Sequence, residues 1–381
     1  MSDALALSGG SVLFINGNLG RGGGEEVCRQ IAEQLRADGV PVDIVNLGPD
    51  RDAWTSFEQL GCRVDQIDLW RDLDAATSLR RLVRLIRERD PVIVHTIGNL
   101  ANLYGSIAGR LAGTRAIVAS EHNTLESWTT RGRAMLAGTL ASSYIAVSTA
   151  CAESLSHSAH VPRRKIRLIQ NGIDLPRLIE IDRLPRGGLR EELGIPVSAP
   201  IVGTVGSLKP QKNYPRWLRV AAMVAAAVPS AHFVVIGGGP LERALQAEAA
   251  SSGLHGRLHF MGARSDGPQL LREFDLFLLT SDREGFGLAL CEAQLFGVPV
   301  VATDTGGVRE VVRDGVTGRL FDPSDEGALA AACAEILLQP AVASSMAAEG
   351  RVWIRSSFDG ARMANEVRAE YSAALSAKGS R

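Results

Sequence analysis

Residues 281–293 read Ser281-Asp282-Arg283-Glu284-Gly285-Phe286-Gly287-Leu288-Ala289-Leu290-Cys291-Glu292-Ala293. An apolar run at 276–279 precedes this stretch, so together they predict a strand, a glycine-containing loop and a helix that begins near Gly287. The same order, a short β-branched strand and then a segment of helical period, recurs along the whole chain. Alternating strands and helices predict parallel sheets joined by crossover helices, and therefore an α/β fold.

The strand–helix units form two series, separated by a segment at 176–200 that is rich in proline, glycine and charge. The predicted strands are 11–15, 42–45, 92–95, 116–120 and 144–147 in the first series, and 201–205, 232–236, 258–261, 276–279 and 298–302 in the second. We therefore expect two Rossmann-like, doubly wound parallel-sheet domains, 1–185 and 186–355. They should face one another across a cleft at the carboxyl ends of their strands, where ligands usually bind.

The composition argues against several classes of protein. The formal net charge is −1 over 381 residues, so no overall field attracts nucleic acid. The five cysteines are scattered without a CxxC pair, which is typical of reduced thiols in a cytosol. We recognise neither a signal peptide nor a run of about 20 apolar residues. A cytoplasmic protein, at most peripheral on the inner face of a membrane, is the expectation.

Metal binding is not indicated by the sequence. His255 and His259 have HxxxH spacing, but Gly256 lies between them and the stretch continues into a predicted strand. A structural role is therefore expected for both histidines, and no metal cofactor is expected.

Three glycine-containing loops follow predicted strands, where their backbone can approach a ligand closely. The stretch 16–25, which contains Gly23 and Gly24, opens a helix whose N-terminus would attract phosphate, although it is not a GxGxxG in register. The stretch 206–213 contains Lys212 at a strand–helix junction, where a point charge suits a diphosphate. The third stretch, 237–240, is three glycines and a proline. Surface or packing turns remain the alternative interpretation of each.

The stretch 281–293 is the most informative of the four. Glu284 lies in the loop and Glu292 in the predicted helix, so two acids eight residues apart could grip two parts of one elongated ligand. The N–H groups of Phe286, Gly287 and Leu288 would meet negative charge between them. An acid that faces ribose hydroxyls and donors that face a diphosphate would suit a nucleotide sugar, whereas two solvent-facing acids are the plainer interpretation.

With these motifs in order, nearly the whole chain resembles the family 4 glycosyltransferases, retaining enzymes of the GT-B fold. The resemblance is carried by the stretches 22–25, 90–95, 121–123, 146–148, 169–174, 206–212, 237–240, 275–281, 284–292 and 299–303. It implies that the first domain binds an acceptor and the second a nucleotide sugar, and that the last helix, about 356–375, crosses back to the first domain.

The resemblance also implies roles for single residues. Glu292 would bind the ribose hydroxyls, Glu284 would lie near the donor sugar, and Lys212 would meet the diphosphate. Further donor contacts would come from the amides of Phe286, Gly287 and Leu288, from Gly23 and Gly24 of the first domain, from Ser207 and Gly238, and from the base-binding segment 263–266 with Arg264. His122 matches the histidine near the reacting sugar.

One position departs from the family. Many members have arginine where this chain has Ser207, and the loss of a charge-assisted contact there would cost about 1.5–3 kcal/mol unless Lys209 compensates. A GT-B protein that binds nucleotide sugars with impaired catalysis is therefore the alternative function. An NAD-dependent dehydrogenase lacks support, because no in-register GxGxxG is followed by an acid about 20 residues later.

Donor and acceptor are only partly indicated. UDP is the favoured nucleotide and GDP the second candidate, and the resemblance implies no metal requirement. The acceptor hydroxyl is unidentified, and polysaccharide, glycolipid or glycoconjugate biosynthesis is the expected setting. Six basic residues and one acid in the segment 131–167 suit contact with anionic lipid or a lipid-linked acceptor, while a solvated face explains them equally well.

Overall fold

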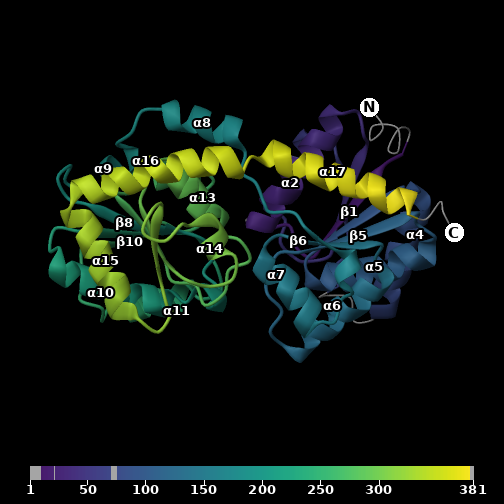
Figure 1. Ribbon diagram of the computed structural model, residues 1–381, viewed down its shortest axis with the longest axis horizontal. Helices are drawn as coiled ribbons and strands as arrows, with labels where there is room; N and C mark the ends of the chain where they lie inside the picture. Colours follow the sequence, from purple (N-terminus) through teal and green to yellow (C-terminus); the bar gives the residue numbers. More distant parts are fainter. Residues whose placement is uncertain (1–9, 21, 70–74, 378–381) are drawn as a thin grey trace. The chain divides into compact units, whose positions relative to one another are not determined.

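The computed structural model describes residues 10–20, 22–69 and 75–377. These residues form two compact units, one of residues up to 172 together with those from 360 onwards, and one of residues 173–359 (Figure 1). The division therefore lies at 172/173 rather than at the expected 185/186. The reason is a set of contacts within the second unit: the Ile173 N–H donates to the Phe358 carbonyl oxygen, and the buried Arg272 donates to the carbonyl oxygens of Asp182 and Pro185.

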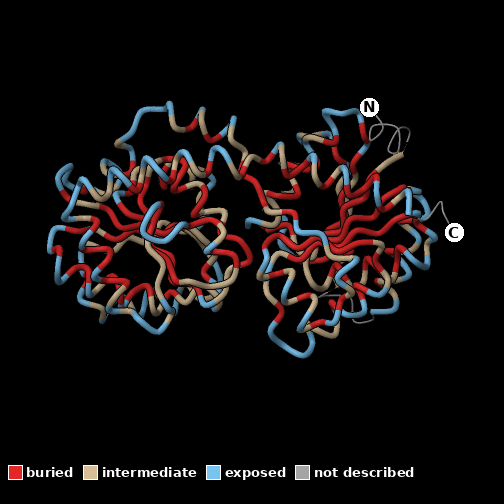
Figure 2. Tube along the Cα trace, in the orientation of Figure 1, coloured by how far each residue is buried: buried red, intermediate tan, exposed pale blue. Residues whose placement is uncertain are grey.

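The first unit contains a sheet of seven parallel strands in the order β3-β2-β1-β4-β5-β6-β7. Its strands are β1 (Val12–Asn16), β2 (Val42–Asn46), β3 (Arg63–Gln66), β4 (Ile93–Ile97), β5 (Ala116–Glu121), β6 (Ser143–Ala146) and β7 (Ile166–Leu168). The central strands β1 and β4 are buried along their whole length (Figure 2), which explains why most of their residues are apolar; Asn16, His95 and Thr96 are the buried polar exceptions. The edge strands β3 and β7 are more exposed and more polar, and the sequence pattern did not predict them.

Helices connect these strands. They are α2 (Gly23–Ala37), α3 (Trp54–Gln59), α4 (Ala75–Arg89), α5 (Asn99–Ala112), α6 (Trp128–Leu140) and α7 (Thr149–Glu153), with a π-helical turn (Ser154–Ser158) and a 3-10 turn (Arg163–Lys165). In α4, Leu82 and Ile86 are buried while Arg80, Arg84 and Arg87 are exposed, as its 3.6-residue period predicts. The last helix, α17 (Gly360–Ser376), belongs to this unit and packs on α2 and beside β5.

The second unit contains six parallel strands in the order β10-β9-β8-β11-β12-β13. They are β8 (Ile201–Val205), β9 (His232–Ile236), β10 (Leu258–Phe260), β11 (Leu276–Leu279), β12 (Val300–Thr303) and β13 (Gly318–Phe321). The core holds Trp217, which meets the Phe233 ring edge-on at 6.3 Å and donates its indole N–H to the Leu278 carbonyl oxygen at 3.2 Å. This hydrogen bond satisfies the only polar atom of the indole inside an apolar core.

The helices of the second unit complete its layers. They are α8 (Leu175–Arg183), α9 (Gly188–Leu193), α10 (Tyr214–Ala227), α11 (Glu242–Ala249), α12 (Gly267–Leu271), α13 (Leu288–Leu295), α14 (Val308–Val311), α15 (Glu326–Leu338) and α16 (Pro340–Ser357), with a 3-10 turn at Pro210–Lys212. Within the described residues, no single helix has the length and hydropathy of a membrane span, and α15 with α16 meets that criterion only as a pair bent by 100°.

Strand order reverses once in each sheet, between β1 and β4 in the first unit and between β8 and β11 in the second. Loops that leave the carboxyl ends of two such strands diverge to opposite faces, which leaves room for a ligand. The loops after β1, β8 and β11 follow the strands at these points, and they are three of the four stretches that the sequence analysis identified as candidate ligand contacts.

Candidate functional site

The loops after β8 and β9 lie against one another, backbone to backbone. The Leu208 N–H donates to the Gly238 carbonyl oxygen at 2.9 Å. A Cβ at Gly237 would lie 1.9 Å from the Gly206 carbonyl oxygen, and one at Gly239 would lie 2.7 Å from that of Leu208. The glycines at 237–239 therefore serve this close approach of two loops.

The loops after β11 and β12 are joined in the same way around Glu284. The Gly307 N–H donates to the Glu284 carbonyl oxygen at 3.0 Å, and Thr303 Oγ1 donates to that of Ser281 at 2.6 Å. Gly306 has φ of +54°, and a Cβ there would lie 1.9 Å from the Glu284 carbonyl oxygen. The loop after β12, which contains Gly306 and Gly307, thus fixes the backbone that carries Glu284.

Lys212 and Glu284 form a direct ion pair. Lys212 Nζ donates to Glu284 Oε1 at 2.9 Å and to Oε2 at 2.8 Å, and the two side chains are 16% and 12% exposed. An ammonium has three N–H donors, so two are used by this carboxylate and one remains for a ligand. The sequence placed these residues on different parts of a donor; the structure brings them together in one contact.

Position 207, where a second positive charge was expected, holds the neutral side chain of Ser207. Ser207 is half-buried, and its carbonyl oxygen accepts a hydrogen bond from the backbone N–H of Lys209 at 2.8 Å, while the Lys209 residue is exposed. Asn213, in the left-handed conformation at φ +46°, ends the 3-10 turn that carries Lys212 and caps α10. Compensation for Ser207 by Lys209 remains a prediction.

Helix α13 begins between the two glutamates of the stretch 281–293, after Glu284 and before Glu292. Its N-cap, Gly287, has φ of +101°, a backbone conformation that residues other than glycine rarely adopt. Phe286 is 3% exposed and meets the Phe358 ring edge-on at 5.3 Å, which anchors the loop to the second unit. Leu288 is the first helical residue and Glu292 is half-buried one turn later. Because the first N–H groups of a helix have no intrahelical partner, the amides of residues 286–288 can serve an anion.

The expected base-binding segment lies beside the third glycine loop. A Cβ at Gly238 would lie 3.2 Å from the Ala263 Cβ. Arg264 is paired with Asp266 at 2.8 Å and with Glu192 at 2.8 Å. These hydrogen bonds, to Asp266 first and then Glu192, raise the pKa of the Arg264 guanidinium. The structure therefore groups Lys212, Glu284, Gly238 and the start of α13 around the carboxyl ends of the strands of the second unit.

The site residues predicted in the first unit also lie together. Gly23 and Gly24 begin α2, and a Cβ at Gly24 would lie 3.9 Å from His122 Cγ. Burial lowers the pKa of His122 to about 4, so its imidazole is neutral at physiological pH. Arg21, which belongs to the same predicted stretch, lies outside the described residues.

A buried carboxyl beside His122 was not predicted. Glu121 is 3% exposed at the end of β5 and accepts a hydrogen bond from Tyr144 Oη at 3.3 Å. Burial raises its pKa to about 7, while hydrogen bonds from Tyr144, Asn99 and the His122 amide act in the opposite direction. The motif 121–123 marked this segment, but no sequence signal shows that a glutamate at a strand end is buried.

Glu121 leads to a prediction about pH and stability. An ordinary glutamate titrates at 4.5, so the folded chain binds this proton more tightly than the unfolded chain does. The contribution of Glu121 to the free energy of unfolding is therefore favourable below pH 4.5 and falls by about 3 kcal/mol as the pH rises through 7.

Urea unfolding of the wild type and of Glu121→Gln at pH 5 and pH 8 measures this effect. On going from pH 5 to pH 8, the free energy of unfolding of the wild type should fall by about 2 to 3 kcal/mol relative to that of the variant, because the other titrations are shared and cancel. Glu88→Gln, at an exposed position of α4, is the control and should show no shift. Equal pH dependence in all three proteins would contradict the prediction.

His259, one of the two histidines with HxxxH spacing, pairs with a histidine of the neighbouring strand β9. His259 stacks on His232, with ring centroids 5.5 Å apart, and their Nε2 and Nδ1 atoms are 3.2 Å apart. Among the described residues, no group of three or more His, Cys, Asp or Glu side chains is arranged to hold a metal ion. All five cysteines are buried free thiols.

Comparison with known proteins gives matches to both halves of the chain. The family described as "Glycosyl transferases group 1" matches residues 186–353, and "Glycosyltransferase Family 4" matches residues 21–177. The UDP-Gal:alpha-D-GlcNAc-diphosphoundecaprenol alpha-1,3-galactosyltransferase of Escherichia coli is 30% identical over 65% of this chain and 67% of its own length.

Two further proteins extend these matches. The GDP-mannose-dependent alpha-(1-6)-phosphatidylinositol monomannoside mannosyltransferase of Mycolicibacterium smegmatis is 31% identical over 77% of this chain and 80% of its own length. Among solved structures, HepE of Anabaena in complex with UDP and glucose superposes with a TM-score of 0.84 at 25% identity, covering 96% of this chain and all of that chain.

Proposed function

Because this chain belongs to the family 4 glycosyltransferases, which share the GT-B fold, we propose that it transfers a sugar from a nucleoside diphosphate to an acceptor hydroxyl with retention of anomeric configuration. The observation that carries the proposal is the Lys212–Glu284 pair beside the start of α13, at the carboxyl ends of the strands of the second unit. A cation, two carboxylates and helix N–H groups there suit an anionic and hydroxyl-rich donor.

In the proposed mechanism, negative charge grows on the leaving diphosphate while the sugar becomes oxocarbenium-like. Lys212 and the amides of residues 286–288 stabilise that charge more in the transition state than in the bound donor, and this difference accelerates the reaction. The leaving phosphate accepts the proton of the acceptor hydroxyl, so no side chain of the protein acts as nucleophile. Lys212 and these amides replace a metal ion, and transfer is expected to persist in EDTA.

We propose a UDP sugar as the donor, with a GDP sugar as the second candidate. HepE, a protein of the same fold, binds UDP and glucose, and the E. coli relative uses UDP-Gal, whereas the M. smegmatis relative depends on GDP-mannose. A thermal-shift screen against UDP, GDP, ADP and TDP sugars distinguishes these donors, and the stabilising one is then used in transfer assays.

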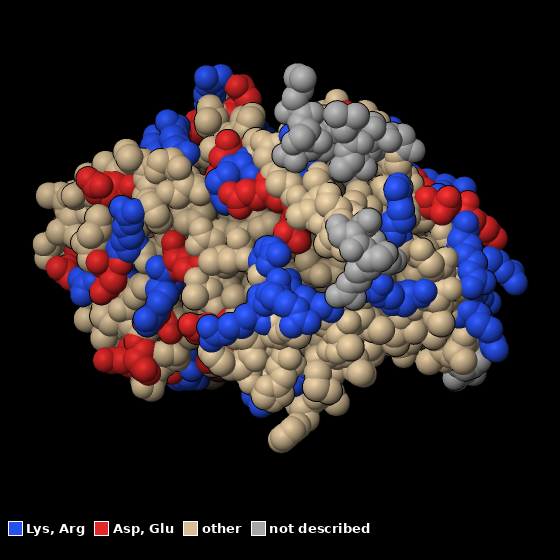
Figure 3. All heavy atoms as spheres, turned by 45° about the vertical axis from the view of Figure 1, so that its right-hand side comes forward, with Lys and Arg blue, Asp and Glu red and all other residues tan. Residues whose placement is uncertain are grey.

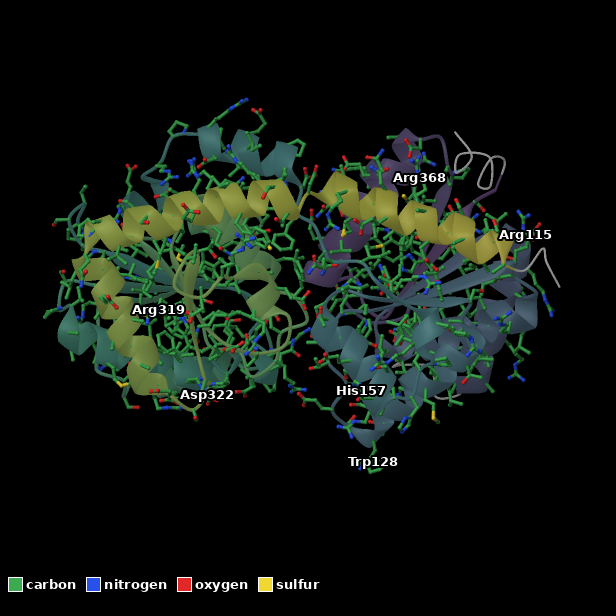
Figure 4. The ribbon with its side chains drawn as sticks, viewed as in Figure 1. Arg115, Trp128, His157, Arg319, Asp322 and Arg368 are labelled. Carbon is green, nitrogen blue, oxygen red and sulfur yellow. The ribbon has the colours of Figure 1, made fainter. Side chains whose placement is uncertain are left out.

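We propose a lipid-linked acceptor, because the two relatives act on diphosphoundecaprenol-linked and phosphatidylinositol-linked sugars. Basic side chains gather in groups on the visible face of the first unit (Figure 3). Trp128, at the start of α6, is 89% exposed and points outward (Figure 4), and Arg131 and Arg133 follow on the same helix. An indole with nearby cations suits the interface of an anionic membrane. Salt-sensitive flotation with anionic liposomes tests this contact.

Glu292 provides the test of the donor assignment. Glu292→Ala should raise the donor KM about 10- to 100-fold, because a hydrogen bond to a charged group contributes about 1.5–3 kcal/mol. Glu349→Ala, at an exposed position of α16, is the matched control and should keep the wild-type KM. An unchanged donor KM in Glu292→Ala would contradict the assignment.

The departure at Ser207 favours one second candidate, a protein that binds nucleotide sugars but turns them over poorly. Thermal stabilisation by a UDP sugar without transfer to any lipid-linked sugar acceptor would support it. Ser207→Arg should then raise donor affinity.

A further inference from the structure

His95 lies at the centre of a buried hydrogen-bonded chain in the first unit. Its Nδ1 is 2.5 Å from Tyr371 Oη and its Nε2 is 2.6 Å from Ser120 Oγ. The three side chains are between 0% and 3% exposed. A neutral imidazole donates from one nitrogen and accepts at the other, so the chain of hydrogen bonds runs in one direction and satisfies both ring nitrogens.

These hydrogen bonds join the last helix to β5, the strand that ends one residue before His122. Tyr371 belongs to α17, His95 to β4 and Ser120 to β5, two residues before His122. The Ser120 carbonyl oxygen is held from another side by Asn102 Nδ2 at 2.9 Å. Hydrogen bonds therefore hold both the hydroxyl and the backbone carbonyl of Ser120, two residues before His122.

Apolar residues of the same helix lie beside this chain. Met363, Val367 and Tyr371 follow one another at four-residue spacing and therefore share one face of α17. Met363 and Val367 line a small cavity with His95, Ser120 and His122. Helix α17 also packs on α2, whose Gly24 lies against the His122 ring.

We infer that Tyr371, His95 and Ser120 are positioning residues that hold the His122 imidazole in its working orientation. The inference rests on the proposed function, in which His122 lies near the reacting sugar. Apolar side chains would fill this space without the cost of burying three polar groups, but they would not fix one orientation of β4, β5 and α17. Because His122 acts on the transferred sugar, its misplacement should lower kcat and leave the donor KM nearly unchanged.

The test uses the full-length protein and two conservative variants. Tyr371→Phe and Ser120→Ala each remove one hydroxyl from an end of the chain. Arg368→Met is the matched control: Arg368, labelled in Figure 4, lies on the same helix as Tyr371 and pairs at 2.8 Å with Asp38, the C-cap residue of α2. Measurements are kcat, donor KM, the melting temperature and the His122 Hε1 NMR resonance, assigned with His122→Gln.

Tyr371→Phe and Ser120→Ala should each lower kcat about 5- to 10-fold with donor KM within about twofold, and should shift the His122 resonance. Arg368→Met should leave both kcat and the His122 resonance unchanged. An unmoved resonance with wild-type kcat in both hydroxyl variants overturns the inference, and so does an equal loss in Arg368→Met. If the wild type transfers no sugar, the proposed function fails, and the His122 resonance alone tests the positioning role. A shifted resonance in the hydroxyl variants supports that role, and an unshifted one overturns it.

Discussion

Replacing Lys212 by methionine is expected to lower kcat/KM for sugar transfer about 100- to 1000-fold, the range seen when a preorganised donor to a developing anion is removed. Two effects combine. The variant loses the positive charge that meets the leaving diphosphate, and it leaves the Glu284 carboxylate, 12% exposed, without the partner 2.8 Å away. Since an unpaired, largely buried charge is unfavourable, the free energy of unfolding should also fall, by about 2 kcal/mol.

A double-mutant cycle separates the two effects. Glu284→Gln with Lys212 present should lower kcat, while the pair Lys212→Met with Glu284→Gln should recover stability but not activity. Lys212→Arg keeps the charge with a different shape and should be intermediate. Turnover close to wild type in both Lys212→Met and Glu284→Gln would remove the assignment of this pair to the donor site.

Gly306→Ala is expected to destabilise the second unit by about 4 kcal/mol or more, an exceptional value for one methyl group. The added Cβ would lie 1.9 Å from the Glu284 carbonyl oxygen, and Gly306 already has φ of +54°. The backbone at Glu284 must move, which should also break the Gly307 N–H hydrogen bond to the same oxygen and raise the donor KM.

Gly315→Ala is the control for the backbone conformation. Gly315 has φ of +73°, but a Cβ there would have no atom within 4 Å. It should therefore cost about 1–2 kcal/mol, the strain of a left-handed alanine, and leave the donor KM unchanged. Chemical unfolding and donor kinetics of both variants measure the difference, and equal losses would show that the contact with Glu284 has no special effect.

Much of the fold could be predicted because short sequence patterns specify its individual strands and helices. The runs at 201–205, 232–236 and 276–279 are strands with the expected bounds, since each is a buried, apolar segment followed by a glycine loop. The strands at 63–66 and 166–168 were missed, because they are short, polar edge strands whose only support is hydrogen bonding to a neighbour.

The sequence proposed a set of candidate site residues, but it could not predict how they are arranged. The order of motifs along the chain, from Gly23 to Glu292, identifies the family, because each motif is a local strand–loop–helix signal. The contact between Lys212 and Glu284 joins residues 72 positions apart, and only the pairing of β8 with β11 brings their loops together.

The sequence by itself therefore determined the α/β class and the two-part organisation, which follow from short-range periodicity and glycine positions. The order of its motifs also supplied the candidate donor-site residues, whose roles remain predictions from the family resemblance. The tertiary structure alone decided that Lys212 and Glu284 form one ion pair, that 173–185 belongs with the second unit and α17 with the first, and that Glu121 and His95 are buried. Burial and long-range contacts depend on how whole elements pack, and no local pattern specifies them.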